Sequence, residues 1–137
     1  GKGYVDQINA SITDIPTQIK LMPFISNMDA AYAAADAIVS RAGALSVSEL
    51  CLVGKPVILV PSPNVSEDHQ TKNAMALVGN DSALLVSDVD SREKLIPALY
   101  ALLENEDKKT KLSHNISALA KPNATKDIVD ACETLIK

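Results

Sequence analysis

A glycine-containing turn that leads into a helix carries the first group of residues that could do chemistry. The stretch Ser40-Arg41-Ala42-Gly43-Ala44-Leu45-Ser46 joins a short apolar run to a helical pattern. Gly43 permits a tight turn and a close approach of the backbone to a ligand. The helix start offers unpaired N–H groups and the positive end of the helix dipole. The turn therefore predicts a binding place for an anionic ligand.

Glu49 follows one helical turn later, and two interpretations of it stay open. Ser46-x-x-Glu49 fits a capping box, in which each residue satisfies a backbone N–H donor of the other. A carboxylate beside a phosphate site can instead accept hydrogen bonds from two adjacent ribose hydroxyls. Spacing alone favours the cap.

A second polar group, Asp68, His69, Gln70 and Asn73, opens a later helix. Gln70 and Asn73 are three residues apart and share a helix face. Neutral amides both donate and accept, which suits a polyhydroxylated sugar. The alternative is an ordinary polar helix start capped by Ser66, and spacing alone favours that alternative.

Neither histidine has a partner that would make it a catalytic base. His69 lies where a loop enters a helix and is a binding candidate, whereas His114 belongs to a helical pattern and is typical of a surface residue. Two scattered histidines and two scattered cysteines match no metal-ligand spacing, and the GxSxG, Walker and GxGxxG patterns are absent. We therefore expect no catalytic residue, metal or cofactor in this chain.

Alternating short strands and helices would position these residues. The expected strands are Ile19–Ile25, Ala37–Ser40, Val57–Pro61 and Ala83–Val86, and the expected helices are Met28–Ala35, Leu45–Val53, Glu67–Val78, Ser91–Leu103, Asp107–Ala120 and Ala124–Ile136. This order predicts parallel βαβ units, and continuous apolar strands predict a sheet covered on both faces. The fold class is thus α/β with a three-layer, Rossmann-like parallel sheet, over which the last three helices pack. Ligands of such sheets bind beyond the carboxyl ends of the strands.

Composition sets the limits on function. The 137 residues suffice for one domain, 47% of them are hydrophobic and only 3% aromatic, so the core must be aliphatic. A net charge of −4 gives no basic surface for nucleic acid. Cys51 and Cys132 form no paired motif, and we expect both to be buried, reduced thiols of a cytosolic protein. No apolar run reaches the roughly 18 residues of a membrane span.

The motifs together resemble one glycosyltransferase family. They run from Pro23-Phe24-Ile25-x-Asn27-Met28-x-x-Ala31-Tyr32-x-x-Ala35-Asp36 through Ser40-Arg41-Ala42-Gly43-Ala44-x-x-x-x-Glu49 and Gly54-x-Pro56 to Val60-Pro61 and Gln70-x-x-Asn73-Ala74. This pattern is similar to the C-terminal domain of the MurG family, the undecaprenyl-pyrophosphoryl-muramoyl-pentapeptide N-acetylglucosaminyltransferases. That family has the GT-B architecture, in which two Rossmann-like domains enclose the active site.

The resemblance assigns roles in binding UDP-N-acetylglucosamine (UDP-GlcNAc). It implies that Ile25 meets the uracil through its backbone, Glu49 binds the ribose, and the helix start faces the diphosphate. The diphosphate residues are Ala44, Leu45 and Ser46, the amides of Gln70 and Asn73 hold the GlcNAc, and Arg41, Gly43 and His69 are further candidates. Many family members carry two successive glutamines where this chain has His69-Gln70.

The resemblance also predicts what lies outside the chain. Gly1–Ala10 opens without the first strand and Gly-rich phosphate turn of a doubly wound domain. We therefore expect a piece of a longer protein, whose N-terminal domain binds the lipid-linked acceptor and supplies the base at the cytoplasmic face of the membrane. The strands of such a domain are ordered 3-2-1-4-5-6, and Ile19–Ile25 would be strand 3. Because strands 1 and 2 would be absent from the chain, a gap would separate strand 3 from strand 4. We expect two chains to pair across the exposed strand edges. The alternatives are that strand 3 pairs directly with strand 4 or that Gly1–Ile15 fills the gap.

Two other functions remain open at this point. The chain could belong to another GT-B enzyme that handles a UDP-sugar, such as a UDP-GlcNAc epimerase. It could also be a non-catalytic α/β nucleotide-binding module, since it holds no complete catalytic set.

Overall fold

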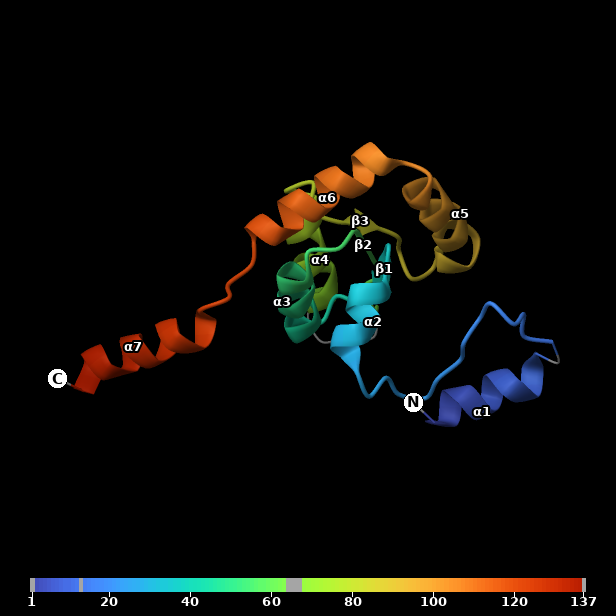
Figure 1. Cartoon of the computed structure of the whole chain (residues 1–137), viewed down its shortest axis with the longest axis horizontal. Coiled ribbons are helices and arrows are strands. Elements are labelled where there is room, and N and C mark those ends of the chain that lie inside the picture. The colour runs from blue at the N-terminus through green and yellow to red at the C-terminus, as the bar shows by residue number, and fades with distance from the viewer. Residues whose placement is uncertain (1, 13, 64–67, 137) are drawn as a thin grey trace. The chain divides into compact units, whose positions relative to one another are not determined.

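The computed structural model describes residues 2–12, 14–63 and 68–136. The elements, labelled in Figure 1, are the helices α1 (Lys2–Ser11), α2 (Met28–Ala34), α3 (Ala44–Val53), α4 (His69–Val78), α5 (Ser91–Leu103), α6 (Glu106–Ala118) and α7 (Ala124–Ile136), and the strands β1 (Ile38–Ser40), β2 (Val57–Leu59) and β3 (Leu84–Leu85). The described part of the chain divides into two compact units, residues 1–34 and 35–137. Each unit is described by itself.

The second unit contains a parallel sheet. Among the described residues it has three strands in the order β1-β2-β3. Ile38 pairs with Val57, and Ile58 pairs with Leu84. Parallel strands joined by α3 and α4 confirm the predicted α/β class, and the sequential order is the one expected for strands 4, 5 and 6 of a doubly wound sheet.

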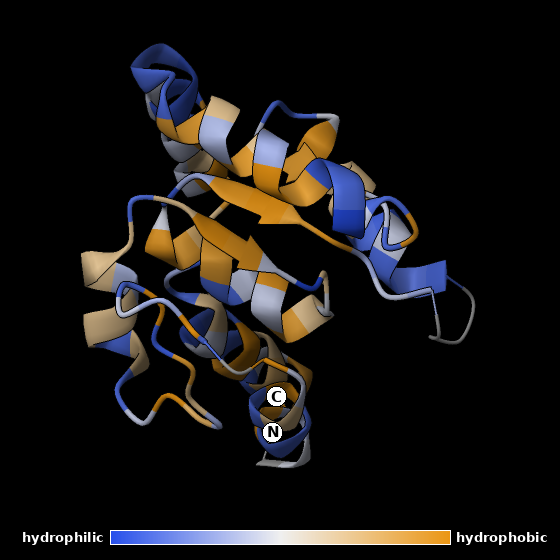
Figure 2. Ribbon diagram, turned by 90° about the vertical axis from the view of Figure 1, so that its right-hand side faces the viewer, coloured by the Kyte–Doolittle hydropathy of each residue, from blue (hydrophilic) through white to orange (hydrophobic). Residues whose placement is uncertain are grey.

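The core lies on both faces of β2. Val57, Ile58 and Leu59 are all fully buried, and because successive side chains of a strand point to opposite faces, both faces must be covered. On one face Ile58 packs with Val60, Val86, Leu102 of α5 and Leu112 of α6. In Figure 2 the strands are almost wholly hydrophobic, whereas the surrounding helices carry both polar and apolar stretches.

The predicted strand at Ile19–Ile25 is wrong. The structure describes this segment in full, and it is not a strand: the Ile19 N–H closes a turn on the Pro16 carbonyl at 2.8 Å, and Phe24 is 80% exposed. A strand exists only through hydrogen bonds to a neighbour. The described residues of the first unit form the helices α1 and α2 and offer no such neighbour.

The expectation for the last three helices is only partly correct. α5 packs on α6, and α6 packs on α3. In α7, which is described throughout, no residue is buried, and Leu135 is 86% exposed. α7 therefore forms as a helix in the place predicted but does not pack over the sheet.

Candidate functional site

The carboxyl ends of the three strands meet at one edge of the sheet, because the strands are parallel and adjacent. The residues that follow β1 lead into α3, those that follow β2 lead towards α4, and those that follow β3 lead into α5. Two groups named from the sequence, the stretch Ser40–Ser46 and the polar residues that open α4, are thus brought together. A further candidate, Ile25, belongs to the first unit, where it is exposed.

The side chain of Arg41 links the ends of the three strands through hydrogen bonds and an ion pair. Its Nη1 donates to the carbonyl of Val60 at 3.1 Å and to the carbonyl of Pro61 at 3.3 Å. The same nitrogen forms an ion pair with the carboxylate of Asp88, a residue beyond the end of β3. The guanidinium therefore spans the connections that leave β1, β2 and β3.

The peptide of Ala42 is held on both sides by the two amides of α4. Gln70 Oε1 accepts from the Ala42 N–H at 3.3 Å and also from the Ser62 N–H at 2.9 Å. Asn73 Nδ2 donates to the Ala42 carbonyl at 3.0 Å, and Ala42 is fully buried. The amide pair predicted to bind a sugar therefore also joins the connections after β1 and β2.

The capping-box interpretation of Ser46 and Glu49 is wrong. α3 begins at Ala44, its N-cap is Gly43, and that cap makes no side-chain hydrogen bond with the described residues. The first helical bond runs from the Val47 N–H to the Gly43 carbonyl at 2.9 Å. Ser46 is therefore already inside the helix, and Glu49, which is exposed, lies in the second turn.

The helix start at Ala44, Leu45 and Ser46 is open at its surface. Leu45 is 88% exposed, Ala44 is exposed and Ser46 is half-buried. The first N–H groups of a helix have no partner within the helix, and they carry the positive end of its dipole. This arrangement can bind an anion.

Gly43 is not required by its own backbone. Its φ of −63° and ψ of 148° are extended values that any residue adopts. A Cβ at this position would meet Ser46 Oγ at 3.7 Å, an ordinary contact. The expectation of a glycine-dependent tight turn is therefore wrong. What Gly43 contributes is the absence of a side chain, which leaves space beside the start of α3.

α4 begins at His69, with Asp68 as N-cap at a φ of 55°. His69 is exposed at this start, and Gln70 and Asn73 are half-buried beneath it. The expected cap Ser66 and the expected first residue Glu67 lie outside the described residues. A cavity of about 180 Å³ adjoins this helix start at the carboxyl edge, lined by Pro61, Pro63, Asp68, Thr71, Leu85, Ser87, Asp88 and Val89.

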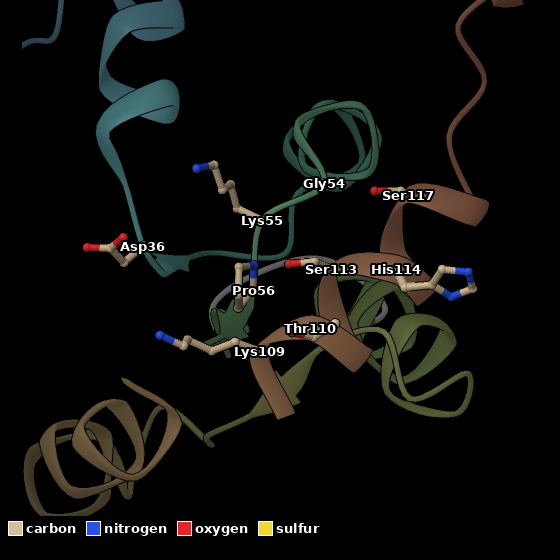
Figure 3. Close-up of a pocket in the computed structure, with 9 residues that line it drawn as sticks. All are labelled: Asp36, Gly54, Lys55, Pro56, Lys109, Thr110, Ser113, His114 and Ser117. Carbon is tan, nitrogen blue, oxygen red and sulfur yellow. The ribbon is translucent and has the colours of Figure 1, made fainter. Parts of the chain in front are cut away.

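A second hollow, of about 600 Å³, lies at the other end of the strands. It is lined by Asp36, Gly54, Lys55, Pro56, Lys109, Thr110, Ser113, His114 and Ser117. Figure 3 shows that the charged ends of Asp36, Lys55 and Lys109 extend to one side of the view at separate places and that His114 points to the opposite side. The charges therefore do not converge on a single ligand.

The two cysteines differ in their exposure to solvent. Cys51 is buried, and its burial raises the pKa of its thiol, whereas Cys132 is exposed, so the expectation of two buried thiols is wrong for Cys132. α7 contributes nothing to the core, which leaves Cys132 on the surface.

Within the described ranges, no three His, Cys, Asp or Glu side chains are grouped so that they could hold a metal ion. None of the described helices has the length and apolar character needed to cross a membrane.

Asp88 is the site residue that the sequence analysis missed. It pairs with Arg41 across 47 positions of the chain, a separation that no local spacing reveals. A signal existed, since Asp88 is a charged residue that follows the short apolar run Ala83–Val86 after a single serine, where a parallel strand delivers side chains to the carboxyl edge.

Comparisons with known proteins agree with this fold. Residues 1–130 match the family model described as glycosyltransferase family 28 C-terminal domain. The UDP-N-acetylglucosamine–N-acetylmuramyl-(pentapeptide) pyrophosphoryl-undecaprenol N-acetylglucosamine transferase of Christiangramia forsetii is 53% identical over 86% of this chain and 32% of its own length. The transferase of the same name from Porphyromonas gingivalis is 46% identical over 100% of this chain and 36% of its own length.

A solved structure gives the same result in three dimensions. The crystal structure of Acinetobacter baumannii MurG superposes with a TM-score of 0.84 at 33% identity, over 98% of this chain and 39% of that chain. The chain spans about a third of the length of the curated relatives named above, 32% and 36%.

The parallel sheet, its open carboxyl edge and these similarities define a Rossmann-like α/β domain of the glycosyltransferase class. The chain belongs to glycosyltransferase family 28 and corresponds to the C-terminal domain of that family. The resemblance to MurG found in the sequence is confirmed.

Proposed function

We propose that this chain is the UDP-GlcNAc-binding part of a peptidoglycan N-acetylglucosaminyltransferase. Its family membership supports the reaction class. One observation supports the site: the open N-terminus of α3 lies at the carboxyl edge of the sheet, on the connection that the amides of Gln70 and Asn73 hold. In the whole protein, meaning this chain with the sequence that fills the other two thirds of its relatives, GlcNAc would pass to undecaprenyl-pyrophosphoryl-MurNAc-pentapeptide.

Each candidate residue has a role in this proposal. The N–H groups at Ala44, Leu45 and Ser46 bind the diphosphate, since a helix start favours phosphate. Glu49 accepts from the ribose hydroxyls, and Gln70 and Asn73 contact the GlcNAc. The backbone of Ile25 meets the uracil, Gly43 leaves room beside the phosphates, and Arg41 and His69 line the same edge.

The proposed reaction is an inverting, metal-independent transfer. A hydroxyl of the muramoyl lipid attacks the anomeric carbon of GlcNAc, the bond from that carbon to the diphosphate oxygen breaks, and UDP leaves. The negative charge that develops on the diphosphate is stabilised by the N–H groups at the start of α3, which are already oriented before the reaction. The base that takes the hydroxyl proton and the acceptor site belong to the other domain, and the reaction uses no cofactor.

The acceptor determines where the whole protein works. An undecaprenyl chain stays in the membrane, so we propose that the protein acts at the cytoplasmic face of the membrane as a peripheral enzyme. We expect no nucleic-acid partner.

Isothermal titration of the whole protein tests the proposal. UDP-GlcNAc and UDP should bind, UDP-glucose should bind more weakly than UDP-GlcNAc, and ADP-glucose should show no saturable binding. Preference for an adenine or guanine nucleotide would overturn the donor assignment and favour a nucleotide-binding module of another kind. Conversion of UDP-GlcNAc to UDP-N-acetylmannosamine, without transfer to a lipid acceptor, would instead identify an epimerase.

A further inference from the structure

The ion pair between Arg41 and Asp88 joins two connections that are far apart in the sequence. Arg41 lies directly beyond β1, Asp88 lies beyond β3 after Val86 and Ser87, and β2 separates the two strands in the sheet. The side chain of Arg41 is 54% exposed and that of Asp88 is 31% exposed. The pair is therefore at the surface of the carboxyl edge, where the candidate site lies.

The position of Arg41 determines the path of the chain into α3. The next residue, Ala42, is fixed through its own peptide by Gln70 and Asn73, and Gly43 then caps the helix. The Arg41 carbonyl accepts from the hydroxyl of its neighbour Ser40 at 2.9 Å, but the contacts that link Arg41 to the other strand ends are made by its side chain, which reaches the carbonyls of Val60 and Pro61 as well as Asp88. Of these three acceptors, only the carboxylate carries a charge, and hydrogen bonds to charged groups are the stronger ones.

We propose that Asp88 is a positioning residue for donor binding. It holds the Arg41 guanidinium across the ends of the strands, and Arg41 in turn fixes the turn that aims the N-terminus of α3 at the diphosphate. Asp88 itself touches neither the ligand nor a reacting atom. The inference rests on the proposed function, because it assigns the diphosphate to the start of α3.

The same strand offers a matched control at its other end. Asp81 precedes β3 and forms an exposed ion pair with Lys111, with 2.8 Å between Oδ2 and Nζ. Asp81 has a φ of 51°, a backbone conformation that asparagine tolerates well. Asp81→Asn and Asp88→Asn therefore remove the same charge from the two ends of β3, and only Asp88→Asn affects the carboxyl edge.

The test is a double-mutant cycle in the whole protein, with UDP-GlcNAc affinity measured by titration. Asp88→Asn should weaken UDP-GlcNAc binding about 1.5- to fivefold, the range expected for a partly exposed ion pair. In the Arg41→Ala background the same substitution should cause no further loss, because Asp88 acts through Arg41. Asp81→Asn should leave the affinity unchanged. The KM for UDP-GlcNAc should rise in Asp88→Asn while kcat stays the same.

Amide hydrogen exchange of the unliganded protein gives a second measurement that needs no ligand. Exchange at residues 42–47 should be faster in Asp88→Asn than in Asp81→Asn. Equal exchange in the two variants, an unchanged affinity in Asp88→Asn, or an equal loss with and without Arg41 would each overturn the inference. A wild-type protein that binds no UDP-GlcNAc would refute the proposed function instead, so the two failures are distinguishable.

Discussion

The amide of Gln70 has to serve the protein and the ligand with different atoms. Its oxygen accepts two backbone N–H groups, from Ala42 and Ser62, which fixes how the amide is turned. Its nitrogen carries two further donors. Gln70 can therefore act on a sugar as a donor, while its oxygen holds together the two connections that carry the site.

This double role changes what Gln70→Ala should do. We expect affinity for UDP to fall, because Ala42 before α3 and Ser62 after β2 each lose a hydrogen bond that holds the two connections together. Affinity for UDP-GlcNAc should fall further, because a sugar contact is lost as well. Asn73→Ala should follow the same order. Titration of each variant with both ligands measures the difference, and equal losses for the two ligands would mean that the amides serve only the chain.

Glu49 gives a prediction at the ribose. Since Gly43 caps α3, Glu49→Ala should not remove a helix cap. It should weaken UDP binding about ten- to a hundredfold, because hydrogen bonds to a charged group contribute about 1.5–3 kcal/mol. Titration with 2′-deoxy-UDP supplies the control. Wild type should prefer UDP over the deoxy ligand and Glu49→Ala should not, whereas an unchanged preference would place the ribose elsewhere.

The two thiols should differ in reactivity. Cys132 is exposed, while Cys51 is buried and its pKa is raised by that burial, so little Cys51 thiolate forms at neutral pH. Iodoacetamide at pH 8 should therefore label Cys132 quickly and Cys51 only after unfolding in urea. Peptide mass spectrometry at successive times checks this order, and equal labelling rates in the folded protein would contradict it.

At the scale of single elements, the end of α3 depends on its glycine. Gly54 has a φ of 68°, and its N–H donates to the Leu50 carbonyl at 3.0 Å. A left-handed conformation costs a residue with a Cβ about 1–2 kcal/mol. A Cβ here would also lie 2.3 Å from Ser117 Oγ, but that hydroxyl ends a rotatable side chain and can turn away. The backbone term should therefore dominate.

We accordingly expect Gly54→Ala to lower the free energy of unfolding by about 1–2 kcal/mol. Adding Ser117→Ala should restore little of it. Gly43→Ala is the matched control, because its extended backbone accepts any residue, and it should keep its stability while weakening binding of UDP. Urea unfolding measures the stability, and a large recovery in the double variant would show that the steric contact dominates.

An element could be predicted when neighbouring residues in the sequence determine it, and could not when it depends on a partner far along the chain. The burial of β2 follows from a continuous apolar run, and α5 and α7 have the predicted boundaries because helix periodicity is a local property. The strand at Ile19–Ile25 could not be judged locally, since a strand requires a neighbour elsewhere in the chain. The pair of Arg41 and Asp88 and the links from Gln70 to Ala42 and Ser62 were hidden for the same reason.

At the scale of the whole molecule, the sheet ends in two edges. Among the described residues, β1 and β3 each pair on one side only, with β2. Unpaired strand edges favour association, so pairing of two chains stays a prediction. Light scattering at several concentrations should show a mass that rises towards twice that of the chain. A constant monomer mass would exclude this pairing.

The brevity of β3 has a consequence for how the molecule opens. Leu84 and Leu85 are its whole length, and the Val86 N–H adds one bond to the Leu59 carbonyl at 3.0 Å. Few backbone bonds make this edge inexpensive to unfold locally, and the charge pair beyond it is weakened by salt. Rising ionic strength should therefore reduce donor affinity by two routes. It screens the diphosphate directly, and it frees the end of β3 to fluctuate, which shortens the time that the turn before α3 spends in its binding conformation.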